Sequence, residues 1–452
     1  MSSTVEQDFD GFAAAMRDEA PDFFPEGTPV FAARAPGRLD VMGGIADYSG
    51  SLVAEMPLAQ AAVVGAQRGD ASDDVTVRSA NAAYEGLTPE VTLPSGAFVN
   101  PVSLHKQLFE GPAGARWAGY AAGCVALLRA EGLVPRDAGA RLFVRSTVPL
   151  GAGVSSSAAV EVAAMRALCA AYDVTLDGLT LARLCQRVEN EVLDAPCGIM
   201  DQVTSALGEA GRLLALLCQP YQVQGTVALP PGWSVFGIDS QVKHAVSGSA
   251  YTRARVAAFM GYKILADRAG NGFGGYLCNV SPDEYRALLP DGLPETMNGA
   301  AFLGTHGGIF DDVTNVAPGE TYDVRACTEH AIFEHARVQR FLECLKDGGD
   351  AAMAEAGQQM VAAHASYSAC GLGAPETDSL VDLARAAQGE AVAGARITGG
   401  GSGGTVALLV RADAEERIAE AVAHAYEDRT GRTPRVIRGT SPGALATDVR
   451  QI

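Results

Sequence analysis

The 452-residue chain is predicted to form an α+β fold with two domains, for three reasons. Its length exceeds what a single hydrophobic core usually supports. Segments typical of strands and of helices are mixed along the chain without the strict strand–helix alternation of a parallel sheet. The pattern also starts afresh after Pro220, so we expect an N-terminal domain at 1–220 and a C-terminal domain at 221–452.

The N-terminal half contains short apolar runs followed by longer segments with helical spacing of apolar residues. The predicted strands of this half are 29–35, 52–58, 62–68, 75–79, 141–147 and 212–218. The predicted helices are 116–132, which ends at Gly132, about 155–172, and 180–192.

The C-terminal half is predicted to place most of its helices between its first strand and its last strands. The predicted strands are 233–239, 394–398, 404–410 and 434–438. The predicted helices are 249–265, 328–346, 350–370, 377–388 and 414–427. Residues 268–325 are rich in Gly, Pro, Asn and Asp, so we expect loops with short helices there. The sequence indicates no role for this long segment.

The overall charge limits the classes of partner. A net charge of −19 argues against binding of nucleic acid or anionic membranes. No apolar run approaches the length of a membrane span, and the acidic N-terminus is unlike a signal peptide. Nine scattered cysteines without zinc spacing are typical of reduced thiols in a cytoplasmic protein. A phosphate compound would have to be bound by local backbone N–H groups, a few cations and a metal.

The stretch PGRLDVMGGIADYSGS (36–51) combines glycines with charged side chains. It has too many glycines for a helix or a plain strand, and such backbone is tolerated where something approaches it closely. Asp40 and Asp47 could form a metal pair, although single acids near a Gly loop are more often hydrogen-bond acceptors.

A second motif, PLGAGVSSSAAVEVAAMRALCAAY (149–172), places Gly151 and Gly153 before Ser155, Ser156 and Ser157. A Gly-rich loop that enters a helix N-terminus presents free N–H groups to an anion, and serine hydroxyls can reach a metal. A turn followed by a helix that the serines cap would give the same pattern. The motif is not a Walker A loop, because no G-K-[ST] follows.

Two further segments contain residues suited to chemistry. RVENEVLDAPCGIMDQ (187–202) places four acids close together: Glu189, Glu191, Asp194 and Asp201. Asp201 has apolar neighbours, so it could be a tuned base or a helix cap. RITGGGSGGTVALLV (396–410) is either a flexible hairpin loop or backbone lying close to a ligand.

Taken together and in this order, the three Gly-rich motifs resemble those of the GHMP kinase superfamily, and within it the galactokinase-like sugar kinases. The resemblance runs from about 30 to 440. Other matching segments are RWAGY (116–120), PCGIMDQ (196–202), SQVKHAVSGSAY (240–251) and MVAAHASYSACGLGAPETDSLVDLA (360–384). The resemblance implies an N-terminal domain like ribosomal protein S5 domain 2, a ferredoxin-like C-terminal domain, and a site between them that uses ATP and Mg²⁺.

The resemblance also implies roles for individual residues. Arg38 matches the arginine near the transferred phosphoryl group, and Asp201 matches the aspartate proposed as base for the anomeric hydroxyl. Ser157 and Glu189 match the magnesium ligands. The residues matched to ATP binding are Gly151, Gly153, Ser155, Ser156, Ser157 and Trp117. The residues matched to sugar binding are Asp40, Gly44, Ile45, Asp47, Gly198 and Tyr251.

The first motif departs from the galactokinase pattern at three positions. Galactokinases usually read G-R-V-N-L-I-G-E-H-T-D-Y, whereas this chain has Asp40 for Asn, Gly44 for Glu and Ile45 for His. In the family that Glu–His pair lies near the C6 hydroxymethyl of galactose, a group that L-arabinopyranose lacks. Unpaired buried polar groups would cost roughly 1–3 kcal/mol each, so an apolar side chain suits the smaller sugar.

The first motif also resembles that of plant L-arabinokinases. We therefore expect ATP-dependent phosphorylation of the C1 hydroxyl of L-arabinose to L-arabinose 1-phosphate and ADP, by a cytoplasmic monomer or weak homodimer. A galactokinase or broad-specificity sugar-1-kinase is the alternative within this class. Glucuronate is less favoured, because its carboxylate would want Arg or Lys near Gly44 and Ile45. A catalytically inactive sugar-sensing regulator is the alternative outside it, but SSSA (155–158) is intact.

Overall fold

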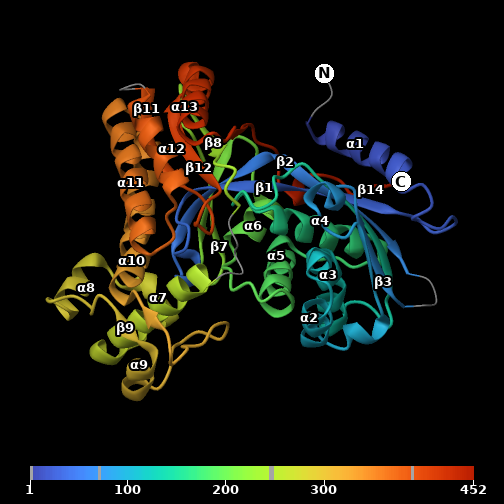
Figure 1. Ribbon diagram of the computed structural model, residues 1–452, viewed down its shortest axis with the longest axis horizontal. Coiled ribbons are helices and arrows are strands. Elements are labelled where there is room, and N and C mark those ends of the chain that lie inside the picture. Colours follow the sequence, from blue (N-terminus) through green and yellow to red (C-terminus); the bar gives the residue numbers. More distant parts are fainter. Residues whose placement is uncertain (1–3, 70–72, 244–248, 388–390) are drawn as a thin grey trace.

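The computed structural model describes residues 4–69, 73–243, 249–387 and 391–452, and it forms two halves built on separate sheets (Figure 1). The N-terminal half contains a large mixed sheet, and the C-terminal half contains a four-stranded antiparallel sheet. In the described part of the chain, no helix has both the length and the apolar character needed to span a membrane.

The N-terminal sheet has the strand order β14-β1-β2-β5-β3-β4, with β6 beside β2 and β7 beside β6. Its strands are β1 (Phe31–Met42), β2 (Leu52–Arg68), β3 (Val75–Ser79), β4 (Glu90–Leu93), β5 (Ala140–Ser146), β6 (Arg212–Leu217), β7 (Gln222–Ala228) and β14 (Arg450–Gln451). Only β3 and β5 pair in parallel; the other pairs are antiparallel.

Two strand predictions are wrong in their extent. The strand expected at 29–35 continues as β1 through Gly37 to Met42, so most of the first motif before its glycine pair is strand. Register shifts between Pro36 and Arg38 and between Asp40 and Met42 accommodate it. The strands expected at 52–58 and 62–68 are one strand, β2, because β1 pairs with both parts while β6 and β5 cover different ends.

Helices cover both faces of this sheet (Figure 1). One face is covered by α1 (Thr4–Glu19), where Phe12 contacts Phe143 with ring centroids 5.6 Å apart. The other face is covered by α2 (Pro101–Glu110), α3 (Gly119–Ala130), α4 (Ser156–Ala171), α5 (Gly178–Arg187) and α6 (Met200–Leu207). The helix expected at 180–192 changes at Val188 into a π-helical turn that ends at Val192. Such turns are common at functional sites.

The C-terminal sheet has the order β11-β12-β8-β13, formed by β8 (Trp233–Asp239), β11 (Val392–Ile397), β12 (Thr405–Arg411) and β13 (Arg435–Ile437). In chain order the strands are β8, β11, β12 and β13, so the first strand, β8, lies between the third and the fourth. This is the ferredoxin-like arrangement, and it confirms that expectation. Its long helices are α7 (Ser249–Ala269), α10 (Val324–Asp347), α11 (Asp350–Ala369), α12 (Pro375–Ala386) and α13 (Glu415–Thr430).

The loop-rich segment at 268–325 does contain short elements, as expected. These are α8 (Pro282–Leu288), β9 (Met297–Asn298), α9 (Gly299–His306) and β10 (Thr321–Tyr322). Figure 1 shows α8, β9 and α9 gathered beside α7, at the end of the C-terminal half away from α13.

The two halves are joined by a shared apolar cluster. It brings Leu39 and Met56 of the first sheet into one core with Phe341 and Leu409 of the second half. The division predicted at 220–221 falls between β6 and β7, which pair with each other, so the change of sheet comes after Ala228. This packing fixes the walls of the cavity that lies between the halves.

Candidate active site

A cavity of about 500 Å³ lies between the two halves and is lined by all three Gly-rich motifs. The predicted site residues on its wall are Arg38, Ile45, Asp47, Trp117, Gly151, Gly153, Ser155, Ser156, Ser157, Glu189, Gly198, Asp201 and Tyr251. Residues far apart in the sequence therefore share one site, as the motifs indicated. Asp40 and Gly44, which the resemblance matched to sugar binding, do not line it.

Asp40 and Gly44 lie behind the wall of the cavity. Asp40 is fully buried, and its carboxylate accepts hydrogen bonds from Arg396 Nη1 at 3.1 Å and from the Gly399 N–H at 3.2 Å. A Cβ atom at Gly44 would overlap the Asp40 carboxylate and the Tyr367 hydroxyl. Asp40 is thus engaged in a buried ion pair, and we no longer assign it to direct sugar contact or to a metal pair with Asp47.

Ile45 is held in a strained backbone conformation. Its φ of +52° lies in the left-handed region, which a β-branched residue rarely adopts. Two buried side chains hold the turn: Glu334 accepts from the Gly43 N–H at 3.2 Å, and His330 Nε2 donates to Gly44 O at 3.1 Å. Burial lowers the pKa of His330 to about 4, so its ring is neutral at pH 7. The result is an apolar side chain on the cavity wall.

Arg38 and Asp201 form the charged centre of the site. Arg38, on β1, donates from Nε to Asp201 Oδ1 at 2.9 Å and from Nη1 to Gly153 O at 2.8 Å. Glu55 Oε2 lies 3.3 Å from Arg38 Nε on the buried side. Burial opposes the charged form of Arg38, but the carboxylates of Asp201, Glu55 and Asp40 outweigh it and raise the arginine pKa. The guanidinium therefore stays charged beside the cavity.

The serines of the second motif do not cap the helix that follows. Ser155 has φ +58° and donates from Oγ to Asp201 Oδ2 at 2.6 Å, and no side chain caps the first turn of α4. Asp201, in the first turn of α6, likewise makes no capping hydrogen bond. The capping interpretations are therefore wrong. The first backbone N–H groups of α4 are thus not capped by Ser155, and such donors suit an anion.

The third motif packs against the second one. Gly399 and Gly404 both have positive φ, and a Cβ atom on either would overlap carbonyl oxygens of the 151–153 loop. Gly399 and Gly400 also line the cavity. The glycines thus permit close contact between two backbones at the site, so the hairpin is part of the cavity wall.

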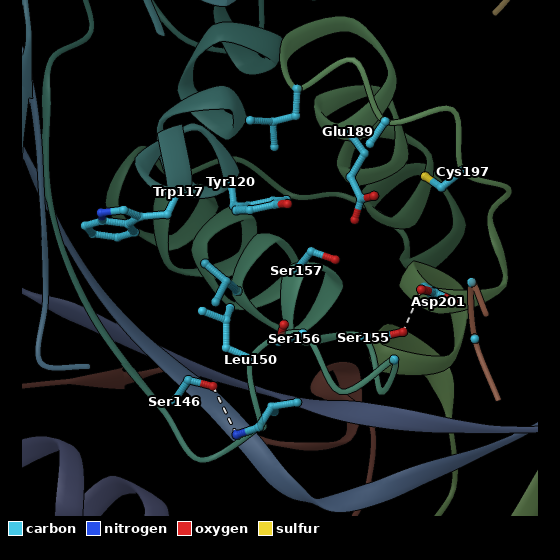
Figure 2. A pocket seen from close by; sticks show the side chains of 18 of the residues that line it. Trp117, Tyr120, Ser146, Leu150, Ser155, Ser156, Ser157, Glu189, Cys197 and Asp201 are labelled. Atoms are coloured by element: carbon cyan, nitrogen blue, oxygen red, sulfur yellow. Dashed lines mark hydrogen bonds between the residues drawn. The ribbon is translucent and has the colours of Figure 1, made fainter. Parts of the chain in front are cut away.

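Glu189 and Ser157 face the same space beside the Gly-rich loop that precedes α4. Figure 2 shows the Ser157 hydroxyl and the Glu189 carboxylate pointing toward one another. Glu189 is buried, and burial raises its pKa to about 7. Gln202 Nε2 lies 3.4 Å from Glu189 Oε1. Of the other acids in this motif, Glu191 pairs with Arg187, and Asp194 does not line the cavity.

Trp117 lies at the far end of the cavity from Asp201, with Ser155, Ser156 and Ser157 between them (Figure 2). Its Nε1 donates to Thr88 O at 2.8 Å, which fixes the indole plane. The apolar end and the charged end of the cavity could thus accept two parts of one nucleotide, or a nucleotide and a second ligand.

At the end of the cavity opposite Trp117, the carboxylate of Asp47 has an oxygen that could accept a hydrogen bond from a ligand. It is 5% exposed, and its Oδ1 has no hydrogen-bond partner among the residues that the structure describes. Gly198 lies so close that any side chain there would overlap the Asp47 carboxylate. Tyr251, from α7, completes this part of the wall. Burial, and then the charge of Asp201, raise the pKa of Asp47 to about 7.

This raised pKa predicts a pH-dependent stability difference for Asp47→Asn. Between the ordinary value of 3.8 and about 7, folded Asp47 keeps a proton that the unfolded chain releases. The free energy of unfolding therefore falls as pH rises through this window, and the penalty is complete above it. The variant lacks this penalty. Its Tm relative to the native chain should rise between about pH 5.5 and about pH 8 by roughly 2 °C or more.

Differential scanning calorimetry on both proteins at the two pH values checks this. Glu189 titrates in both proteins, so its contribution cancels in the difference. A constant difference in Tm would mean that Asp47 ionises in the folded protein at its ordinary pKa.

Three buried residues of the site were missed by the sequence predictions. These are Glu55 under Arg38, Arg396 paired with Asp40, and Tyr367 beside Gly44. Glu55 had one visible signal, a carboxylate within the apolar strand run 52–58. Arg396 and Tyr367 lie in the family-matching segments 396–410 and 360–384, but their partners are remote in sequence and could not be predicted. Part of the segment 240–251 that matched the family, residues 244–248, lies outside the described residues.

The chain matches two family models over parts of its length, and curated relatives over more than nine tenths of it. The model for the GHMP kinases N terminal domain matches 119–209, and that for GHMP kinases C terminal matches 341–428. The galactokinase of Streptomyces coelicolor is 32% identical, over 93% of this chain and 94% of that protein. The chain belongs to the GHMP kinase family.

Within the GHMP kinases, the chain is 38% identical to an L-arabinokinase of Arabidopsis thaliana, over 92% of the chain. It spans about half the length of that relative, 46%. The fold matches the crystal structure of Lactococcus lactis galactokinase complexed with galactose, with a TM-score of 0.74 and 21% identity over the full length of both chains. The two-domain GHMP kinase architecture is thereby confirmed.

Proposed function

We propose that this GHMP kinase transfers a phosphoryl group from ATP to the C1 hydroxyl of L-arabinose, giving L-arabinose 1-phosphate and ADP. The observation that carries the proposal is the cavity itself. It joins an uncapped helix N-terminus to a charged Arg38–Asp201 pair and then to the carboxylate of Asp47, with Ile45 on the same wall. The arabinokinase relative, 38% identical, supports the choice of sugar.

The nucleotide would lie with its base toward Trp117 and its phosphates at the start of α4. Backbone N–H groups of a helix N-terminus suit phosphate oxygens. The loop residues assigned to the phosphates are Gly151, Gly153, Ser155, Ser156 and Ser157.

The residues present also fit Mg²⁺. Ser157 and Glu189 offer oxygen ligands facing one space, and Mg²⁺ commonly binds one or two protein oxygens and takes its other ligands from phosphate and water. Bound there, the ion would neutralise phosphate charge.

The sugar would occupy the other end of the cavity. Asp47 Oδ1 would accept a hydrogen bond from a ring hydroxyl, and Tyr251 and Gly198 would shape the surrounding wall. Asp201 would accept the proton of the C1 hydroxyl, while Arg38 spreads positive charge over the transferred group. Phosphoryl transfer depends mainly on such positioning and charge neutralisation.

Ile45 is the residue that we assign to the choice of pentose. It presents methyl groups where a hexose would place its C6 hydroxymethyl, and it leaves no polar group there to be satisfied. ADP release measured with L-arabinose, D-galactose and D-glucuronate tests the function. Turnover of L-arabinose with the highest kcat/KM supports it, a preference for D-galactose favours the galactokinase alternative, and no ADP with any sugar favours the regulator.

Shortening Ile45 should relax this choice. We expect Ile45→Ala to raise the ratio of kcat/KM for D-galactose to that for L-arabinose about tenfold or more, because removed side-chain volume admits the hydroxymethyl group. Gly44→Glu is not a useful companion, since a side chain at 44 overlaps Asp40 and Tyr367. An unchanged ratio, measured by the same assay with Ile397→Ala as a control for loss of core volume, would place the discrimination elsewhere.

We also propose a cytoplasmic location, which the nine free cysteines support. We further propose that its partners are the small molecules sugar and ATP, and that the protein is a monomer or a weak homodimer.

A further inference from the structure

The segment at 268–325 is connected to the sugar end of the cavity through one buried ion pair. Asp311, in the loop after α9, binds Arg255 of α7 in a two-pronged contact, with Nε–Oδ2 at 2.8 Å and Nη2–Oδ1 at 2.7 Å. The side chain of Arg255 is 6% exposed and that of Asp311 is 3% exposed. Neither residue lines the cavity. A fully engaged, desolvated pair of this kind is one of the strongest polar contacts that a protein makes.

The remaining face of Arg255 reaches the cavity wall. Its Nη1 donates to Pro196 O at 2.9 Å and to Cys197 O at 3.4 Å. Its guanidinium also lies 5.1 Å from the ring centroid of Tyr48, the residue after Asp47. Arg255 therefore holds the backbone on either side of the sugar pocket while Asp311 holds Arg255.

The backbone that Arg255 holds is closely packed against the Asp47 carboxylate. Gly198 directly follows Cys197, and it presses on the Asp47 carboxylate so closely that no Cβ fits. Tyr251 lies one helical turn before Arg255 on α7 and lines the same pocket. A small shift of the guanidinium would move Gly198, Asp47 and Tyr251 together.

The loop that carries Asp311 is preorganised for this contact. Asp311 also accepts from Thr314 Oγ1 at 2.6 Å and from the Val313 N–H at 3.1 Å, which fixes its carboxylate in the loop. The Phe310 ring lies against α7, with Lys263 Nζ 4.8 Å from its centroid. Arg255, Val313 and Thr314 therefore hold the Asp311 carboxylate in position without a bound ligand.

From this arrangement we infer that Asp311 is a positioning residue for the sugar, and that the 268–325 segment serves the active site by fixing Arg255. The inference rests on the proposed function, because it concerns the sugar end of that cavity. The nucleotide end is formed by other elements, around Trp117 and α4, so the effect should be confined to the sugar.

The test is a comparison of steady-state kinetics in four variants with the sugar that the native chain turns over best. Asp311→Asn should raise KM for the sugar about tenfold or more, since displaced binding groups lose their alignment. KM for ATP should stay within about twofold, as for a change remote from that end. Asp311→Glu, which restores the carboxylate, should recover part of the loss.

Asp267→Asn is the matched control. Asp267, on α7, also links this helix to the segment, through His306 Nδ1 at 2.8 Å, but its side chain is 39% exposed. It should leave both KM values unchanged. The double variant Arg255→Met/Asp311→Leu guards against misfolding, because it leaves no unpaired buried charge. It should keep a near-native Tm and show the same rise in sugar KM.

A native-like sugar KM in Asp311→Asn, or in the folded double variant, would overturn the inference. Equal increases in KM for sugar and ATP would also overturn it, because they would indicate general damage. Absence of turnover by the native chain with any sugar would instead overturn the proposed function, and the inference with it.

Discussion

Replacing Arg38 with methionine is expected to lower kcat about 10³-fold, the largest effect of any single change in this site. Arg38 is the one cation among the cavity-lining residues near Asp201, and it is held in place by Asp201 and Gly153 O. Methionine keeps much of the side-chain volume but removes the charge that would balance the transferred phosphoryl group. Steady-state measurement of ADP formation at saturating sugar and ATP tests this.

Loss of a buried arginine also destabilises the fold, so a control is needed. Arg34→Met removes another fully buried arginine, which pairs with Asp8 at 2.7 Å under α1, far from the cavity. We expect it to lower Tm while kcat of the folded protein stays within about twofold. If Arg38→Met kept more than about a tenth of the native kcat, charge stabilisation by Arg38 would not be a main source of the rate.

Replacing Asp201 with asparagine is expected to lower kcat by about 10²-fold or more, as for loss of a general base. Asparagine keeps the shape: its amide oxygen can still accept from Arg38, and its NH2 group can donate to Ser155 Oγ. It cannot take the proton of the C1 hydroxyl. Steady-state kcat, with Tm measured on the same preparation, tests the prediction.

The variant Glu55→Gln distinguishes two roles of Asp201, as general base and as ion-pair partner of Arg38. Glu55 is the second carboxylate on Arg38, 3.3 Å from Nε, but it is fully buried and does not line the cavity. If Asp201 acts only by holding Arg38, the two variants should lose activity alike. If it acts as the base, Glu55→Gln should stay within about tenfold of the native kcat. A near-native Asp201→Asn would mean that Arg38 and phosphate neutralisation suffice without a base.

Most of the helices, the strands of the second half and a part of the cavity lining could be predicted from the sequence. The helix at 155–172 and the strand at 404–410 follow from local apolar spacing, and the structure places them at Ser156–Ala171 and Thr405–Arg411. The helices α1, α2 and α6 were not predicted. β2 was divided in two by a predicted gap at 59–61, whereas in the sheet β1 pairs with residues on both sides of that gap.

The sequence by itself showed which groups the site could use. The Gly-rich loop before α4, Arg38, and the acids Asp47, Glu189 and Asp201 are visible without a fold, and the resemblance of their motifs to those of galactokinase-like kinases implied their roles. The departure from the galactokinase motif at Gly44 and Ile45 also indicated L-arabinose as the sugar.

Only the tertiary structure decided how these groups are used. It assigned Ser155 to Asp201 rather than to a helix cap, turned Asp40 away from the sugar toward Arg396, and connected Asp311 through Arg255 to the pocket. Each of these contacts joins side chains far apart in the chain. Sequence periodicity reports which face of an element is buried, whereas the partner of a buried charge depends on which elements the fold brings together.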